Sequence, residues 1–200
     1  DLKDQANVTR YINWLKDEKG LNFNAYEDLW QWSVTDIEDF WESLWVFFGI
    51  KASKNYSQVL SEKKMPGARW FSGARLNYAE NLLRYRDDRV ALTFKGEGQE
   101  IRCLTYAELY AEVASVAGAL RGLGVRAHDR VVGFMPNMPE TIIAMLAAAS
   151  IGAIWSSCSP DFGIKGVLDR FGQIKPKVLF TADGYIFKGK RFDSLKRIAD

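Results

Sequence analysis

The chain has 200 residues, of which 48% are hydrophobic, so it can build a substantial buried core. Its 27 Lys and Arg residues nearly balance 25 Asp and Glu residues, which excludes a strong net field for recruiting nucleic acid or an anionic membrane. Its two cysteines, Cys103 and Cys158, match no metal-binding or redox spacing and favour a reducing, cytoplasmic location. The longest apolar run, residues 141–155, is shorter than the ~20 residues that a membrane span needs.

The first part of the chain predicts helices rich in aromatic residues. Apolar residues recur at helical spacing over residues 8–15, and Asn24 is a candidate cap for the next helix. Residues 35–38 (TDIE) have the form of a capping box, and Gly49 is a candidate stop for the helix that follows. That helix carries an apolar stripe, which we interpret as core packing rather than a binding surface; it comprises Ile37, Phe40, Trp41, Leu44, Trp45 and Phe48.

A polar, lysine-rich stretch at residues 50–70 predicts an exposed connection, and a short helix is expected near residues 78–83. The charged segment RYRDDR at residues 84–89 then indicates a domain boundary. We therefore expect a helical N-terminal extension over residues 1–84 and a second domain over residues 85–200.

From residue 90 onward the pattern alternates between strands and helices. This alternation predicts an α/β fold, namely the first βαβαβ portion of a mostly parallel sheet. The expected elements are a hairpin over 90–94 and 100–104, a helix opened by a capping box at 105–108 and ending at 122 or 124, a strand at 130–135, a helix from 139 to about 150, a strand at 153–157, a helix over 163–173, a strand at 177–182 and a helix from 192.

Parallel strands joined by crossover helices end on one edge of the sheet, where α/β folds bind ligands. Three segments leave that edge: residues 135–138, 157–163 and 181–191. In the second of them, Ser159 is expected to cap the next helix, with Pro160 in its first turn.

The sequence gives little support for a nucleophile or a metal site. The G-x-S-x-G pattern of a hydrolase is absent, and His128, the one histidine, is expected in a turn at the opposite end of a strand. Cys158 is interpreted as a small buried residue. The G-x-x-x-x-G-K pattern at residues 184–190 is followed by Arg191 instead of the Ser or Thr of a phosphate-binding loop.

The third segment carries Lys188, Lys190 and Arg191 beside Tyr185 and Phe187. Cations that can bind phosphate next to an aromatic ring that can stack on a base suit a nucleotide-like ligand. An exposed basic loop without a ligand explains these residues equally well.

Four stretches together resemble the N-terminal part of the acetoacetyl-CoA synthetases, a branch of the adenylate-forming acyl-CoA synthetase superfamily. They are residues 26–48, 70–83, 134–163 and 179–190. LTYAEL at residues 104–109 is similar to the first core motif of the superfamily, and AAASIGAIWSSCSP is similar to its second. SPDFG together with GYIFKGK favours the acetoacetyl-CoA branch over the acetyl-CoA branch.

The resemblance implies an ATP-dependent acetoacetate–CoA ligase that uses Mg²⁺ and forms an acyl-adenylate before CoA displaces AMP. The ATP-binding and catalytic motifs of such an enzyme would lie beyond residue 200, so we expect no catalytic residue in this segment and no activity without the rest of its own chain. Two alternatives stay open: a segment of another short-chain acyl-CoA synthetase, and a standalone nucleotide-binding, CoA-binding or interaction module.

The resemblance also implies contacts with CoA. The loop at residues 159–161 aligns with a loop that packs near the CoA adenine, and two nucleotide-contacting arginines of related enzymes fall on Phe187 and Lys190. The second charge is kept and the first is lost, so Lys188 could replace it or Phe187 could stack on adenine. The candidate CoA contacts are therefore Ser159, Pro160, Asp161, Phe187, Lys188 and Lys190.

Overall fold

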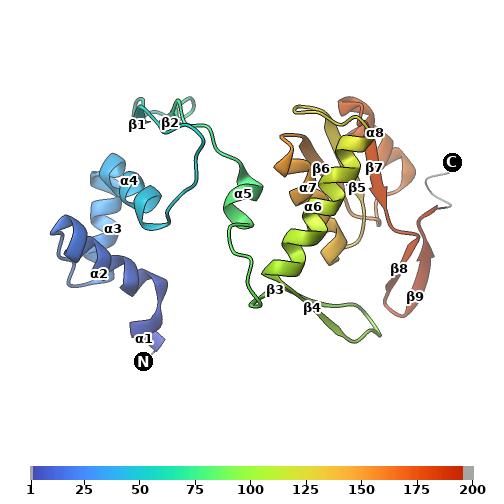
Figure 1. The fold of residues 1–200 in the computed structure, drawn as a ribbon, viewed down its shortest axis with the longest axis horizontal. Helices are drawn as coiled ribbons and strands as arrows, with labels where there is room; N and C mark the ends of the chain where they lie inside the picture. The colour runs from blue at the N-terminus through green and yellow to red at the C-terminus, as the bar shows by residue number, and fades with distance from the viewer. Residues whose placement is uncertain (1, 196–200) are drawn as a thin grey trace. The chain divides into compact units, whose positions relative to one another are not determined.

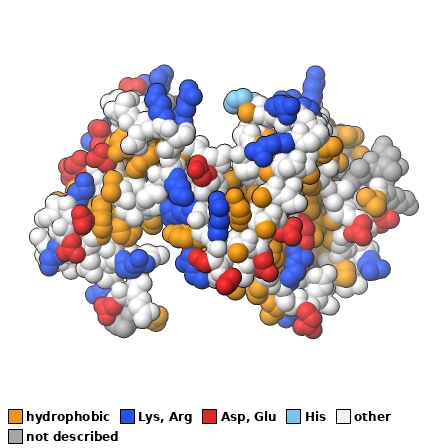
Figure 2. Space-filling model, in the orientation of Figure 1, with side chains coloured by type: hydrophobic (Ala, Val, Ile, Leu, Met, Phe, Trp, Pro, Cys, Tyr) orange, Lys and Arg blue, Asp and Glu red, His pale blue; other side chains and the backbone are white. Residues whose placement is uncertain are grey.

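The computed structural model describes residues 2–195, and the chain divides into two units, Asp1–Leu76 and Asn77–Asp200. Figure 1 colours the first unit from blue to green and the second from green to red. None of the described helices is long and apolar enough to cross a membrane. Figure 2 shows Lys and Arg side chains as well as Asp and Glu side chains on both units, in line with the balanced charge of the chain.

Aromatic side chains hold the first unit together. Tyr11 and Leu29 are buried, and the Phe40 ring meets the Tyr11 ring edge-on at 6.4 Å. Trp45, on the same helix as Phe40, packs on Phe71 with ring centroids 4.7 Å apart. The predicted core packing is therefore only partly right: Phe40 and Leu44 pack against the buried cluster, whereas Trp41 and Phe48 stay exposed. The elements are α1 (Leu2–Gln5), α2 (Asn7–Lys19), α3 (Tyr26–Thr35), α4 (Ile37–Phe47) and the antiparallel strands β1 (Gln58–Leu60) and β2 (Trp70–Ser72).

The predicted capping box at residues 35–38 is wrong. Thr35 is the last residue of α3, and its hydroxyl group donates to the carbonyl oxygen of Gln31 at 3.0 Å. A hydroxyl engaged with the preceding helix cannot cap the next one. Helix α4 begins directly after Asp36, whose side chain makes no capping hydrogen bond.

Two connections in the first unit also differ from expectation. Asn24 does not cap α3, because the helix begins after Ala25, and the Asp28 carboxylate accepts the backbone N–H groups of Asn24 and Ala25 at 3.0 and 3.1 Å. The stretch at residues 50–70 is not wholly irregular, since it contains β1, which pairs with β2.

The second unit is an α/β fold, as the sequence predicts. Its parallel sheet has the strand order β6-β5-β7, and two antiparallel hairpins, β3-β4 and β8-β9, accompany it. The elements are α5 (Tyr78–Leu82), β3 (Val90–Lys95), β4 (Ile101–Thr105), α6 (Tyr106–Gly122), β5 (Arg130–Phe134), α7 (Pro139–Ser150), β6 (Ile154–Cys158), α8 (Ile164–Ile174), β7 (Val178–Thr181), β8 (Gly184–Phe187) and β9 (Lys190–Asp193).

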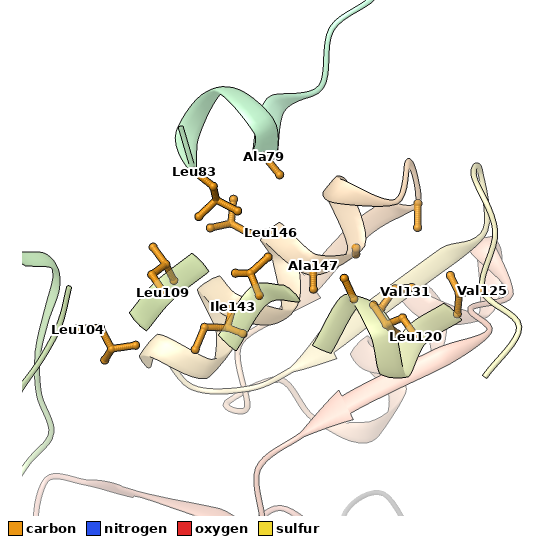
Figure 3. Packing of buried hydrophobic residues seen from close by; sticks show 14 residues of the cluster. Ala79, Leu83, Leu104, Leu109, Leu120, Val125, Val131, Ile143, Leu146 and Ala147 are labelled. Atoms are coloured by element: carbon orange, nitrogen blue, oxygen red, sulfur yellow. The ribbon is translucent and has the colours of Figure 1, made fainter. Parts of the chain in front are cut away.

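Neighbouring residues of β5 belong to different hydrophobic layers. Val131 lies in the cluster that contains Leu120 of α6 and Leu146 of α7, which Figure 3 shows from close by. Val132 belongs to a second cluster with Phe171 of α8. This period of two is the pattern of a strand covered on both faces, and each fully buried apolar side chain contributes about 1.5–3 kcal/mol.

The predicted capping box of α6 is confirmed. The N–H group of Glu108 donates to the Thr105 hydroxyl oxygen at 3.2 Å, and the Thr105 N–H group donates to a Glu108 carboxylate oxygen at 2.8 Å. The backbone N–H and hydroxyl groups of Thr105 lower the pKa of Glu108, because they favour its ionised form.

The expected helix from residue 192 is wrong at its start. Phe192 lies in β9, opposite Tyr185 of β8, because the segment after β7 folds back on itself as a hairpin. The last part of that prediction, residues 196–200, lies outside the described residues.

Candidate functional site

The three parallel strands end level with one another. Phe134 at the end of β5 pairs with Cys158 at the end of β6 and with Thr181 at the end of β7. The segments that follow these strands therefore leave the same edge of the sheet, as the sequence predicts, and this edge is where α/β folds bind ligands.

The loop after β6 is a tight turn centred on Ser159. The Ser159 hydroxyl group donates to a carboxylate oxygen of Asp161 at 3.2 Å, and its oxygen accepts the Asp161 N–H group at 3.3 Å. The Phe162 N–H group donates to the Ser159 carbonyl oxygen at 3.1 Å. The predictions that Ser159 caps the next helix and that Pro160 lies in its first turn are wrong, because the turn occupies the Ser159 hydroxyl group and α8 begins only after Gly163.

The segment after β7 is a hairpin, where the sequence predicts a loop. Phe187 pairs with Lys190, and the two residues between them, Lys188 and Gly189, have φ angles of +52° and +72°. Two consecutive residues with positive φ are typical of the type I′ turn that matches the twist of a hairpin. The Lys188 ammonium group lies 5.2 Å from the centre of the Phe187 ring, within the range of a cation–π contact.

Tyr185 joins the loop after β6 to this hairpin. Its hydroxyl group donates to the Asp161 carboxylate at 2.7 Å and lies 3.5 Å from the Pro160 carbonyl oxygen. Its ring stacks on Phe192 with centroids 5.1 Å apart and 14° between the planes. The contact places Asp161 beside β8, so two of the three segments at this edge meet.

The six candidate residues form two groups. Ser159, Pro160 and Asp161 lie beside the base of the hairpin, and Phe187, Lys188 and Lys190 lie at its tip. The distance along β8 from Tyr185 to the turn is about 10 Å at the usual rise per strand residue. An extended nucleotide ligand is long enough to contact both groups.

A cleft of about 560 Å³ lies along the same hairpin. It is lined by Gln99 from the β3-β4 turn and by residues of both hairpin strands, among them Tyr185, Ile186 and Arg191. No local sequence pattern places Gln99 beside the hairpin, since it lies more than 80 positions before it in the chain.

Cys158 is buried, whereas His128 is exposed. Cys158 is buried in the cluster that packs on α8, as the sequence predicts. His128 lies in a turn with a φ of +69°, and its backbone N–H group donates to the Gly152 carbonyl oxygen at 2.9 Å.

Most of the second unit, residues 79–199, matches the family model described as AMP-binding enzyme. The chain belongs to the AMP-binding enzyme family. Residues 26–82 match a second model, described as acetyl-coenzyme A synthetase N-terminus, so the family match extends into the helical first unit.

Relatives of this chain include acetoacetyl-CoA synthetases. The Danio rerio protein is 46% identical over 202 residues, covering 99% of this chain and 30% of that protein. The Rhizobium meliloti protein is 45% identical over 193 residues, covering 96% of this chain and 30% of that protein. The structure of acetoacetyl-CoA synthetase from Streptomyces lividans superposes with a TM-score of 0.91 at 45% identity, covering 98% of this chain and 31% of that one. The chain thus spans about 30% of the length of these relatives.

In this family member, the exposed cations of the β8-β9 hairpin suit a phosphate group. Three cationic residues stand within four positions, interrupted only by Gly189: Lys188, Lys190 and Arg191. Each can donate hydrogen bonds to phosphate oxygens. Among residues 2–195, no group of three or more His, Cys, Asp or Glu side chains is arranged to hold a metal ion. The cations of the hairpin thus fit the anionic groups of a nucleotide.

Proposed function

We propose that this chain forms the N-terminal part of an ATP-dependent acetoacetate–CoA ligase. The observation that carries the proposal is its 45–46% identity to acetoacetyl-CoA synthetases over nearly its whole length. In the reaction, the acetoacetate carboxylate attacks ATP and releases pyrophosphate, and the CoA thiol then displaces AMP to give acetoacetyl-CoA. Mg²⁺ would offset the charge of the ATP phosphates. A cytoplasmic location and a role in ketone-body metabolism belong to the same proposal.

The contribution of this chain is to bind the nucleotide part of CoA. The loop at Ser159, Pro160 and Asp161 contacts the purine end, and the hairpin tip, with Lys188 and Lys190, contacts phosphate. Two features support this assignment: Tyr185 joins the loop to the hairpin, and the tip presents cations beside the exposed Phe187 ring.

The acid is tested with the full-length protein that contains this chain. Acetoacetate, acetate and propionate are compared as substrates with ATP and CoA, and AMP and thioester are measured. We expect acetoacetate to give the highest kcat/KM. Faster turnover of acetate or propionate would replace acetoacetate in the proposal, and no thioester from any acid would refute the ligase activity.

The CoA contact is tested in the same protein by Lys190→Ala, with Lys63→Ala as the control on an exposed lysine of the first unit. Loss of a charge that meets a phosphate should raise the KM for CoA about tenfold and leave the KM for ATP unchanged. An unchanged KM for CoA in Lys190→Ala would mean that this residue is only part of an exposed basic turn.

A further inference from the structure

The tip of the β8-β9 hairpin is tied to a distant turn of the chain. Glu97 lies between β3 and β4, and one of its carboxylate oxygens accepts the backbone N–H group of Gly189 at 2.7 Å. The two residues are 92 positions apart. Gln99, in the same β3-β4 turn, lines the cleft beside the hairpin. The β3-β4 turn therefore forms part of the surroundings of the hairpin tip.

The turn at Lys188 and Gly189 has a backbone conformation that is unfavourable for lysine. Lys188 has a φ of +52°, a region that residues other than glycine seldom occupy. The strand pairing stops at Phe187 and Lys190, so the Gly189 amide lies outside the ladder. A carboxylate oxygen of Glu97 accepts a hydrogen bond from this N–H group. The bond holds the turn in the conformation in which Lys188 and Lys190 flank Gly189.

We propose that Glu97 is a positioning residue for the binding of the CoA phosphates. The inference rests on the proposed function of the hairpin as a CoA contact. Glu97 acts through the Gly189 amide: it fixes the backbone from which Lys188 and Lys190 extend, and it touches no ligand itself.

The direction in which CoA affinity changes when Glu97 is removed distinguishes a positioning role from a purely electrostatic one. A carboxylate near two lysines reduces the local positive potential, so by charge alone its removal should tighten the binding of an anion. If Glu97 positions the turn, its removal should weaken binding instead. A glutamine at this position keeps an oxygen that can accept the Gly189 N–H group but carries no charge.

The test compares four variants of the full-length protein: Glu97→Ala, Glu97→Gln, Lys188→Asn and Glu100→Ala. Glu100 is an exposed residue close to Glu97 in the chain, so its variant controls for loss of one negative charge. Asn-Gly is a preferred type I′ sequence, so Lys188→Asn removes the Lys188 charge while keeping the turn. The measurements are the KM and the calorimetric Kd for CoA, the KM for ATP, and the rate of trypsin cleavage after Lys188 or, in Lys188→Asn, after Lys190.

We expect Glu97→Ala to raise the KM and Kd for CoA about fivefold, the scale of one lost hydrogen bond, and to speed trypsin cleavage after Lys188. Glu97→Gln and Glu100→Ala should bind CoA as well as the unaltered protein or slightly better. The KM for ATP should not change in any variant.

Three results would contradict parts of the inference in distinguishable ways. If Glu97→Ala behaves like Glu100→Ala while Lys188→Asn weakens CoA binding, the hairpin binds CoA but Glu97 does not position it. If Glu97→Ala speeds trypsin cleavage and no variant alters CoA binding, the positioning contact exists and the proposed CoA site is wrong. If Glu97→Gln is as impaired as Glu97→Ala, the carboxylate charge is required and the hydrogen-bond explanation fails.

Discussion

The hydroxyl group of Tyr185 donates a 2.7 Å hydrogen bond to the Asp161 carboxylate, across 24 positions of the chain. The ring of the same residue stacks on Phe192 of the opposite strand. One side chain therefore uses its polar end to hold the loop after β6 and its apolar face to hold the hairpin. Most of the candidate CoA contacts lie within a few residues of these two interactions.

Tyr185→Phe should separate the two roles, because it removes the hydroxyl group and keeps the ring. We expect the free energy of unfolding to fall by about 1 kcal/mol, the typical value of one hydrogen bond. We expect the KM for CoA of the full-length protein to rise about 3–10-fold, with little change in kcat, because the loop at Asp161 loses its attachment. Steady-state kinetics measure the effect, and an unchanged KM for CoA would show that the loop keeps its position without Tyr185.

Gly184→Ala should open the base of the hairpin. A Cβ atom at this position would lie 2.5 Å from the backbone carbonyl oxygen of Phe192, so the two strands must move apart. We expect faster amide hydrogen exchange over residues 184–193 and a higher KM for CoA. Gly163→Ala is the matched control, because a Cβ atom there meets no other atom within 4 Å. Equal exchange rates in the two variants would contradict the predicted clash.

Gly133→Ala should destabilise the parallel sheet. The added Cβ atom would lie 2.6 Å from the Trp155 ring, and such overpacking costs about 1–3 kcal/mol. Replacing Trp155 with Leu in the same protein should remove most of this cost, so the effects of the two substitutions should not add. Urea unfolding of the single and double variants measures the coupling. Additive losses would show that the indole ring can move away at no cost.

Asp129 should make stability depend on pH in the acid range. The Asp129 carboxylate accepts hydrogen bonds from the backbone N–H group of Arg126, at 2.7 Å, and from the Lys177 ammonium group, at 3.0 Å. Both contacts lower the pKa of Asp129 below its ordinary value of 3.8. The folded protein therefore binds this proton less readily than the unfolded chain does. The resulting stabilisation is complete above the ordinary pKa and is lost as the pH falls through the lower pKa of the folded state.

Asp129→Asn should accordingly be less stable than the unaltered protein at pH 7, and the difference should shrink as the pH falls below about 4. Urea unfolding at several pH values measures this difference. A gap of the same size at pH 7 and at pH 3 would show that the charge of Asp129 contributes nothing.

From β3 to β7, the order of strands and helices follows from hydrophobic periodicity and glycine stops, whereas the β8-β9 hairpin was not predicted. The two predicted capping boxes differ in whether a preceding helix engages the capping hydroxyl group. Thr105 ends a strand, so its hydroxyl group is available to α6, whereas Thr35 ends a helix and its hydroxyl group bonds back to that helix. The two residues have the same local sequence pattern and different partners.

The candidate site was predictable in outline, because the ends of parallel strands must share one edge. Its internal contacts were not. The bond from Tyr185 to Asp161 and the bond from Glu97 to Gly189 join segments 24 and 92 positions apart, and no local pattern specifies either pair. The hairpin itself had a local signal in Lys188-Gly189, but lysine is a less usual residue than asparagine at the first position of a type I′ turn.

The alternation along β5 makes the alignment of its neighbours unusually strict. Val131 and Val132 contribute to separate clusters on the two faces of the sheet. A slip of β5 by one position would place Arg130 or Gly133 at one of these two buried positions and would also shift the end of this strand by about 3.3 Å against its neighbours. Inserting or deleting a single residue within Arg130–Phe134 should thus disturb both hydrophobic clusters and the binding edge together.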